Sequence, residues 1–203
     1  HDIFWNGCYD LPLFKNQGEI AINNLEFEFG GNCYSKETWV YTDSYGDFWP
    51  EHAFANEYNN FCFDGQSGRT SLEALDSLKL VLSYGMPKMI VWLMGMNDAD
   101  TDSSINTNWR NAVIELVKIC HENDIKLVLS TIPNCPNIRN TYKNDFVRST
   151  FFEYIDLAKI LGADEMGSSW FTGLLSGDNV HPTTKGAKII SEYISHSIPQ
   201  IEQ

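Results

Sequence analysis

A serine, an aspartate and a histidine occur in two stretches of the sequence that could form one catalytic site. Ser44 lies in VYTDSYGDFW, and Asp178 and His181 lie more than a hundred residues later in SGDNVHPTTKG. A serine hydroxyl is a poor nucleophile until a histidine accepts its proton, and a carboxylate orients that histidine. Three residues apart in a loop, Asp178 can fold back onto Nδ1 of His181, which leaves Nε2 to face Ser44. These residue types predict nucleophilic attack on a carbonyl carbon.

The oxyanion formed by such an attack needs hydrogen-bond donors. The backbone N–H groups of Ser44 and Gly68 and the side-chain amide of Asn97 could supply three. Gly68 suits close approach because it has no Cβ. Each residue also has an ordinary reading as a turn residue, since serine, asparagine, aspartate and glycine are common in turns. Their joint occurrence is what favours a site.

The elements that would position these residues follow an alternating pattern. From residue 38 onward, short β-branched or aromatic runs alternate with helical patterns, which is typical of βαβ units and a parallel sheet. Leucines recur at helical spacing between 72 and 82, after a capping box of Thr70 and Glu73. Apolar stripes over 109–120 and 187–194 predict two further helices. Five strands are expected, at 38–42, 60–64, 88–94, 125–131 and 151–157.

The candidate residues all follow strands of this expected sheet or precede its last helix. Ser44 comes after the first strand, Gly68 after the second and Asn97 after the third. Asp178 and His181 come just before the final helix. Ligands bind outside the carboxyl ends of the strands in an open parallel sheet. The placement therefore predicts one shared site at that edge.

These stretches resemble the consensus blocks of the SGNH hydrolase superfamily, also called GDSL esterases and lipases, which is named after an essential Ser, Gly, Asn and His. The resemblance covers most of the chain. It implies a flavodoxin-like three-layer α/β/α sandwich with a five-stranded parallel sheet. It also implies that Ser44 is the nucleophile, that Gly68 and Asn97 are oxyanion donors, and that Asp178 and His181 are the acid and the base.

The sequence departs from the family pattern at the nucleophile. The usual Gly-Asp-Ser-Leu reads Thr42-Asp43-Ser44-Tyr45 here, so the first glycine is replaced by a residue with a side chain. We expect this change to alter the geometry of the turn or the choice of substrate, because the Asp-Ser pair is retained.

The first 37 residues are expected to form a β-rich extension packed on a hydrolase domain of residues 38–203. In LEFEF, Leu25, Phe27 and Phe29 alternate onto one face, and glycines are frequent around them. A segment of this length cannot bury a core of its own.

Charge and hydropathy exclude some classes of partner. The formal net charge is -13, which repels nucleic acid and anionic membrane surfaces. No run of 18 apolar residues occurs, so no membrane span is expected. The expected partner is a small-molecule or glycan ester, and the sequence does not predict an oligomeric state.

The cysteines and histidines indicate no metal site. Five cysteines are an odd number and none forms a CxxC pair, so most are expected to be buried small hydrophobes. Cys8 and Cys33 could pair if the protein is exported, and an exported location is slightly favoured over a cytoplasmic one. The histidines other than His181 lack ligand spacing. No metal and no cofactor is expected.

The sequence thus predicts a serine ester hydrolase that acts through a Ser-His-Asp triad. An acetyl group on a carbohydrate is the favoured substrate, by analogy with superfamily members that carry appended β segments. Tyr45 and Trp170 are expected to contact the substrate, and Arg69 to bind a polar group on it. The alternatives are lysophospholipid or thioester hydrolysis, and a glycan-binding module on a degenerate hydrolase scaffold.

Overall fold

The computed structural model describes residues 36–47, 61–98, 107–164 and 170–201. Nearly all of the expected β-rich extension, residues 1–35, lies outside these ranges, so its packing on the main domain stays a prediction.

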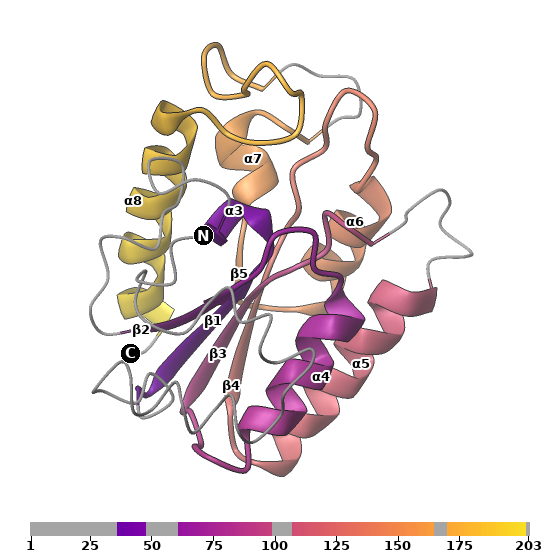
Figure 1. Cartoon of the computed structure of the whole chain (residues 1–203), viewed down its shortest axis with the longest axis vertical. Helices are drawn as coiled ribbons and strands as arrows, with labels where there is room; N and C mark the ends of the chain where they lie inside the picture. The colour runs from indigo at the N-terminus through magenta and orange to yellow at the C-terminus, as the bar shows by residue number, and fades with distance from the viewer. Residues whose placement is uncertain (1–35, 48–60, 99–106, 165–169, 202–203) are drawn as a thin grey trace.

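Five parallel strands form a single sheet in the order β2-β1-β3-β4-β5 (Figure 1). Among the described residues, the first strand, β1, lies inside the sheet, β2 lies at one edge, and the chain then crosses back to β3 beside β1. The order of the strands therefore switches between β1 and β3, and a cleft for ligands is expected above that switch. The strands are β1 (Thr38–Thr42), β2 (Phe61–Gly65), β3 (Met89–Leu93), β4 (Lys126–Ser130) and β5 (Tyr154–Ile155).

Helices cover both faces of the sheet, which confirms the expected α/β architecture. Figure 1 shows α4 and α5 packed side by side on one face and α8 on the opposite face. All side chains of β1 and β3 are buried, as expected for parallel strands covered on both sides. The helices are α3 (Ser44–Asp47), α4 (Ser71–Val81), α5 (Thr107–Glu122), α6 (Thr141–Thr150), α7 (Leu157–Leu161) and α8 (Thr184–Ile201).

The fifth strand is much shorter than the sequence pattern predicts. The apolar run over 151–157 gives only a two-residue strand, Tyr154–Ile155. Asp156 ends it, because its side chain accepts a hydrogen bond from the backbone N–H of Lys159 and caps α7. The remaining apolar residues of the run therefore belong to a loop and to a helix.

The cysteines follow the expectation in part. Cys120 and Cys135 are free and buried, and burial raises the pKa of their thiols to about 12 and about 11, respectively. Cys62 is also buried, but it forms a disulfide bond. Cys62 is therefore an exception to the expectation that most cysteines are simple buried hydrophobes, which Cys120 and Cys135 follow. In the described part of the chain, no helix is both long and apolar enough to cross a membrane.

A buried lysine ties α6 to the loop that follows β3. Lys143 is completely buried, and its ammonium group donates to the backbone carbonyls of Gly95 and Asp98 at 2.9 and 2.8 Å. It also donates to Oδ1 of Asn140 at 3.0 Å. All three N–H donors of the ammonium thus have acceptors, as a buried cation requires. The loop after β3 carries Asn97, so this contact fixes a segment of the candidate site.

We predict that Lys143→Met lowers the free energy of unfolding by about 3 kcal/mol or more, because it leaves three buried acceptors without their donor. Urea unfolding followed by circular dichroism measures the change. The control is Lys159→Met, which alters an exposed lysine and should shift stability by less than about 0.5 kcal/mol. Equal stability of the two variants would contradict the role assigned to Lys143.

Candidate active site

The segment that carries Ser44 is a tight connection between β1 and the single turn of α3. Asp43 holds this connection, because its Oδ1 accepts the backbone N–H of Tyr45 at 3.0 Å and its carbonyl accepts the N–H of Gly46 at 3.1 Å. Ser44 itself is 5% exposed. The hydroxyl of Ser44 is thus presented at the carboxyl end of β1, an inner strand of the sheet.

The threonine that replaces the family's first glycine is accommodated by a glycine four residues later. Thr42 is fully buried, and a Cβ placed on Gly46 would lie 2.1 Å from its Oγ1. Such a contact is impossible, so the missing side chain at position 46 provides the space for the side chain at position 42. The turn therefore keeps room for Ser44 despite the departure from the motif.

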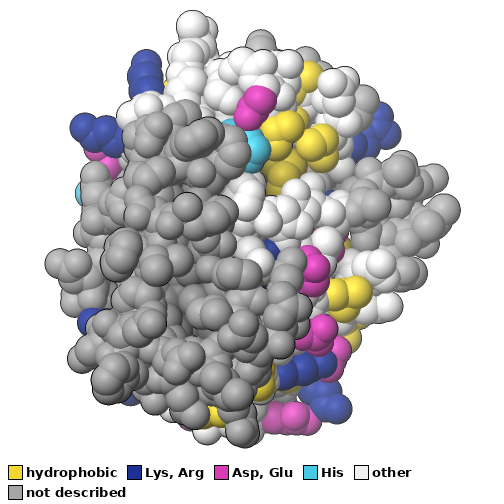
Figure 2. Space-filling model, in the orientation of Figure 1, with side chains coloured by type: hydrophobic (Ala, Val, Ile, Leu, Met, Phe, Trp, Pro, Cys, Tyr) yellow, Lys and Arg dark blue, Asp and Glu magenta, His cyan; other side chains and the backbone are white. Residues whose placement is uncertain are grey.

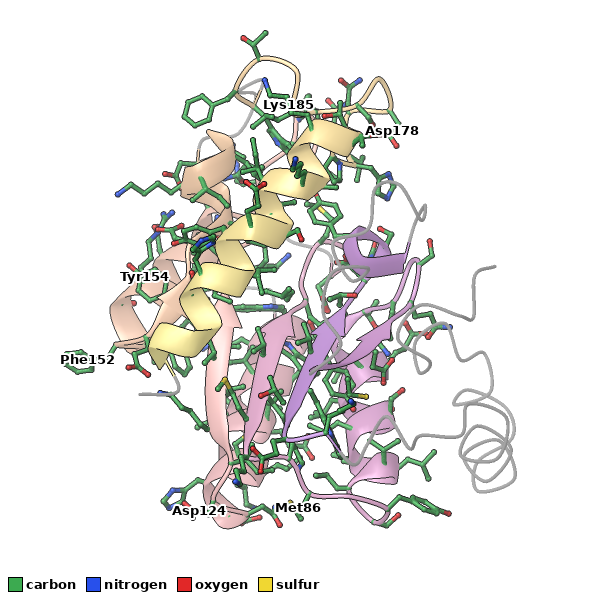
Figure 3. All side chains as sticks on the ribbon, turned by 90° about the vertical axis from the view of Figure 1, so that its left-hand side faces the viewer. Met86, Asp124, Phe152, Tyr154, Asp178 and Lys185 are labelled. Carbon is green, nitrogen blue, oxygen red and sulfur yellow. The ribbon has the colours of Figure 1, made fainter. Side chains whose placement is uncertain are left out.

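The structure brings Ser44, His181 and Asp178 together in a continuous chain of hydrogen bonds. Nε2 of His181 lies 2.9 Å from Oγ of Ser44, and Nδ1 lies 2.7 Å from Oδ2 of Asp178. Asp178 lies on the loop before α8, at the end of the molecule opposite to Asp124 (Figure 3). On the face shown in Figure 2, a histidine lies between an acidic side chain and a group of hydrophobic side chains.

Asp178 is held as a carboxylate by its own loop. Its second oxygen, Oδ1, accepts the hydroxyl of Ser176 at 2.7 Å and the backbone N–H groups of Val180 and His181, both at 2.9 Å. Partial burial raises the pKa of Asp178, but these hydrogen bonds outweigh burial and hold that pKa well below its usual range. Asn179 permits the tight turn with a left-handed backbone, φ 63°. An ionised Asp178 can therefore orient His181 and stabilise its protonated form.

The expected oxyanion donors lie at the ends of neighbouring strands. Gly68 follows β2 in a left-handed conformation, φ 74°, which favours glycine. Asn97 follows β3, and its Nδ2 donates to the backbone carbonyl of Arg69 at 3.1 Å. A primary amide carries two N–H groups, so this bond fixes the amide of Asn97 and leaves the second N–H for another acceptor. Ser44, Gly68 and Asn97 thus follow β1, β2 and β3, which are three adjacent strands of the sheet.

Arg69 does not lie where a substrate contact was expected. It is 1% exposed, and its guanidinium pairs with the carboxylate of Asp64 at 2.6 Å. The same guanidinium donates to the backbone carbonyl of Thr42 at 2.8 Å. Arg69 therefore links three segments of the candidate site. Its side chain binds the segment that leads to Ser44, its carbonyl accepts the amide of Asn97, and it directly follows Gly68 in the chain. The geometry favours a role in positioning the site, because the charged group is engaged inside the protein.

The two aromatic residues expected to contact the substrate are also turned inward. Tyr45 and Trp170 are 5% and 3% exposed, and their rings meet edge to face with centroids 6.3 Å apart. Nε1 of Trp170 donates to the carbonyl of Asn134 at 2.9 Å. The hydroxyl of Tyr45 donates to the carbonyl of Val180 at 2.7 Å. Both residues support the wall of the site and do not offer an open stacking platform.

A small, mostly apolar cavity lies beneath the nucleophile turn. Its volume is about 10 Å³, enough for one water molecule at most. Asp43 faces this cavity and is 2% exposed. Burial raises the pKa of Asp43 to about 6, although the N–H of Tyr45 and the charge of Arg69 act in the opposite direction. The cavity is lined by Asp43, Tyr45, Leu93, Met96, Ile132 and Leu157, among others.

The site holds the kinds of chemical group that acyl transfer to a serine requires. A hydroxyl, an imidazole and a carboxylate are hydrogen-bonded in series, so that the imidazole can accept the proton of the hydroxyl. Among the residues that the structure describes, no group of three or more His, Cys, Asp or Glu side chains could hold a metal ion. The sheet order and this arrangement together define a flavodoxin-like α/β fold with a candidate serine hydrolase centre.

Comparison with solved structures supports this class at the level of fold. The chain is similar to a GDSL-like lipase from Bacteroides thetaiotaomicron, with 18% identity, a TM-score of 0.58 and coverage of 81% of this chain and 89% of that one. It is similar to the esterase EstA from a Pseudoalteromonas species, with 18% identity, a TM-score of 0.58 and coverage of 81% and 98%.

A lipase/acylhydrolase from Enterococcus faecalis is 19% identical, with a TM-score of 0.58 and coverage of 80% and 95%. No family model and no curated protein matches the sequence. The structural likeness confirms the fold that the resemblance to the SGNH hydrolases implied.

We predict that Asp43→Asn weakens the pH dependence of stability between pH 4 and pH 6. The folded protein keeps a proton on Asp43 up to about pH 6, whereas the unfolded chain loses it near the ordinary value of 3.8. The folded state therefore binds more protons in this range, and stability falls as the pH rises through it, by about 2 to 3 kcal/mol. The asparagine side chain does not titrate, so this loss should disappear.

Urea unfolding at several pH values measures the effect of this substitution. Asp145→Asn, which changes an exposed carboxylate, should retain the wild-type slope. The assignment to Asp43 is wrong if both variants keep that slope.

Proposed function

We propose that this chain is a serine ester hydrolase of the SGNH type. The observation that supports it most is the chain of hydrogen bonds from Ser44 through His181 to Asp178, at 2.9 and 2.7 Å. If Ser44 were only a turn residue and His181 only a surface residue, nothing would favour a hydrogen bond between them across 137 positions of sequence. The fold neighbours described as esterases and lipases add support, although their identity to this chain is low.

In the proposed reaction, Oγ of Ser44 attacks the ester carbonyl while Nε2 of His181 accepts the hydroxyl proton. The carbonyl oxygen becomes an oxyanion. It accepts hydrogen bonds from the backbone N–H groups of Ser44 and Gly68 and from the side-chain amide of Asn97. The C–O bond to the alcohol then breaks, and His181 returns the proton to the leaving oxygen. Water repeats the sequence on the acyl-serine, which releases the carboxylic acid and restores Ser44.

We propose a small acyl group, such as acetate on a carbohydrate, as the substrate. The formal net charge of -13 supports an uncharged alcohol partner, because it disfavours phosphate-bearing thioesters and anionic lipid surfaces. The burial of Tyr45 and Trp170 does not support the substrate contacts that the sequence led us to expect of them. A panel of acyl esters distinguishes this substrate from the enzymatic alternatives, which are lysophospholipid and thioester hydrolysis.

We also propose that the protein functions outside the cytoplasm. The disulfide bond of Cys62 supports this location, because disulfides persist in oxidising compartments and are rare in the cytosol.

We predict that a fluorophosphonate forms a covalent adduct with Ser44, because the reagent reports an activated serine without requiring the natural substrate. Mass spectrometry of the digested protein locates the adduct. His181→Ala should abolish labelling at Ser44, since the hydroxyl then loses its base. His196→Ala is the control, because His196 is exposed on α8 and should label like the wild type.

Two other outcomes of this experiment contradict the proposal in different ways. Labelling that persists in His181→Ala would exclude His181 as the base. An absence of labelling in the folded wild type would favour the glycan-binding module on a degenerate hydrolase scaffold.

We predict that Asn97→Ala lowers kcat on 4-nitrophenyl acetate by about 10²-fold to 10³-fold, with little change in KM, because the amide acts on the oxyanion of the transition state. Steady-state kinetics measures both constants. Asn123→Ala is the matched control, since Asn123 also donates its amide to a backbone carbonyl, that of Ile119. A wild-type kcat in Asn97→Ala would exclude the amide as an oxyanion donor.

A further inference from the structure

We propose that Tyr45 is a positioning residue that holds the loop carrying Asp178 and His181 against the segment carrying Ser44. The hydroxyl of Tyr45 and the carbonyl of Val180 make this contact. The role in catalysis rests on the proposed serine hydrolase function, whereas the contact itself can be tested without it.

The loop over residues 173–183 is well ordered within itself. The N–H of Ser176 donates to the carbonyl of His181 at 2.9 Å, and the N–H of Thr183 donates to the carbonyl of Leu174 at 2.8 Å. Thr183 also donates its hydroxyl to the carbonyl of Gly173 at 2.6 Å. These bonds begin and end in the same loop. They fix the loop's own shape but not its distance from Ser44.

Tyr45 supplies a contact across this gap. It directly follows Ser44, and its hydroxyl donates at 2.7 Å to Val180, which directly precedes His181. In the part of the chain that the structure describes, this bond and the Ser44–His181 bond itself are the two hydrogen bonds between residues 44–47 and the loop. Tyr45 can therefore help to keep the distance between nucleophile and base when the Ser44–His181 bond opens during a reaction.

The ring of Tyr45 adds to the same contact. It meets the imidazole of His181 edge to face, with centroids 6.1 Å apart and planes at 62°. The backbone N–H of Tyr45 is fixed on Asp43, so the ring is anchored on the side of Ser44. Burial, and then the neighbouring Cys135 and Asp43, raise the pKa of the phenol well above its ordinary value. The hydroxyl therefore remains protonated, and able to donate, at neutral pH.

This contact belongs to this sequence and not to the general motif. The usual motif has leucine where this chain has Tyr45, and a leucine side chain has no donor for the carbonyl of Val180. Cys135 also approaches the Val180 carbonyl, but its sulfur lies 3.8 Å away and is a weak donor. Removal of the Tyr45 hydroxyl should therefore loosen the loop while the apolar packing of the ring is kept.

The test is Tyr45→Phe, compared with Tyr154→Phe as a matched control. Tyr154 lies on β5, away from Asp178 (Figure 3). A misplaced base lowers the rate of the chemical step, so kcat for 4-nitrophenyl acetate should fall about fivefold to twentyfold in Tyr45→Phe with KM nearly unchanged. Tyr154→Phe should match the wild type. An unchanged kcat in Tyr45→Phe overturns the positioning role.

A second comparison separates positioning from general loss of structure. In a His181→Ala background, Tyr45→Phe should cause no further loss of residual activity, because the residue through which it acts is absent. A full additional loss in that background would show that Tyr45 acts independently of His181 and would overturn the proposal.

The contact is also measurable when no ester is hydrolysed. Amide hydrogen exchange over residues 173–183 should be at least fivefold faster in Tyr45→Phe than in the wild type or Tyr154→Phe. A wild type that neither labels nor hydrolyses esters, with faster exchange in Tyr45→Phe, would remove the proposed function and retain the contact. Unchanged exchange would overturn the contact, whatever the activity.

Discussion

The hydrogen bond between Ser44 and His181 is the interaction around which the rest of the molecule is arranged, because it joins residues 137 positions apart. Neither residue could hold this geometry alone. The parallel sheet positions Ser44, since the switch in strand order places the carboxyl end of β1 where a ligand can reach it. The loop before α8 positions His181, and its internal hydrogen bonds present Asp178 and His181 as a unit.

Two buried cations show how the fold uses charge to define this edge. Arg69 and Lys143 both direct their donors to backbone carbonyls of segments that carry candidate site residues. Burying a cation costs free energy that its hydrogen bonds must offset. Alternative loop arrangements would leave these charges without acceptors. We infer that the two residues fix the positions of these loops as well as contributing to stability.

Much of the site could be predicted from the sequence because its residue types are informative in order and spacing. The capping box of Thr70 and Glu73 could also be predicted from the sequence, and it starts α4 as expected. The burial of Arg69 could not be predicted, because arginine is usually a surface residue. Its ion pair with the buried Asp64 is evident only in the three-dimensional structure. The missing side chain of Gly46 gave no signal either, since its meaning depends on a neighbour that differs from the family pattern.

The side chain of Thr42 occupies the space that a side chain at Gly46 would need, and this has an evolutionary consequence. The two residues occupy one shared volume, so a side chain at the first position of the motif requires glycine at the fifth. Relatives should therefore show covariation, with either glycine first and a larger residue fifth, or the reverse. A search pattern that scores each position independently treats Thr42 as a defect, although the glycine has only moved by one helical turn.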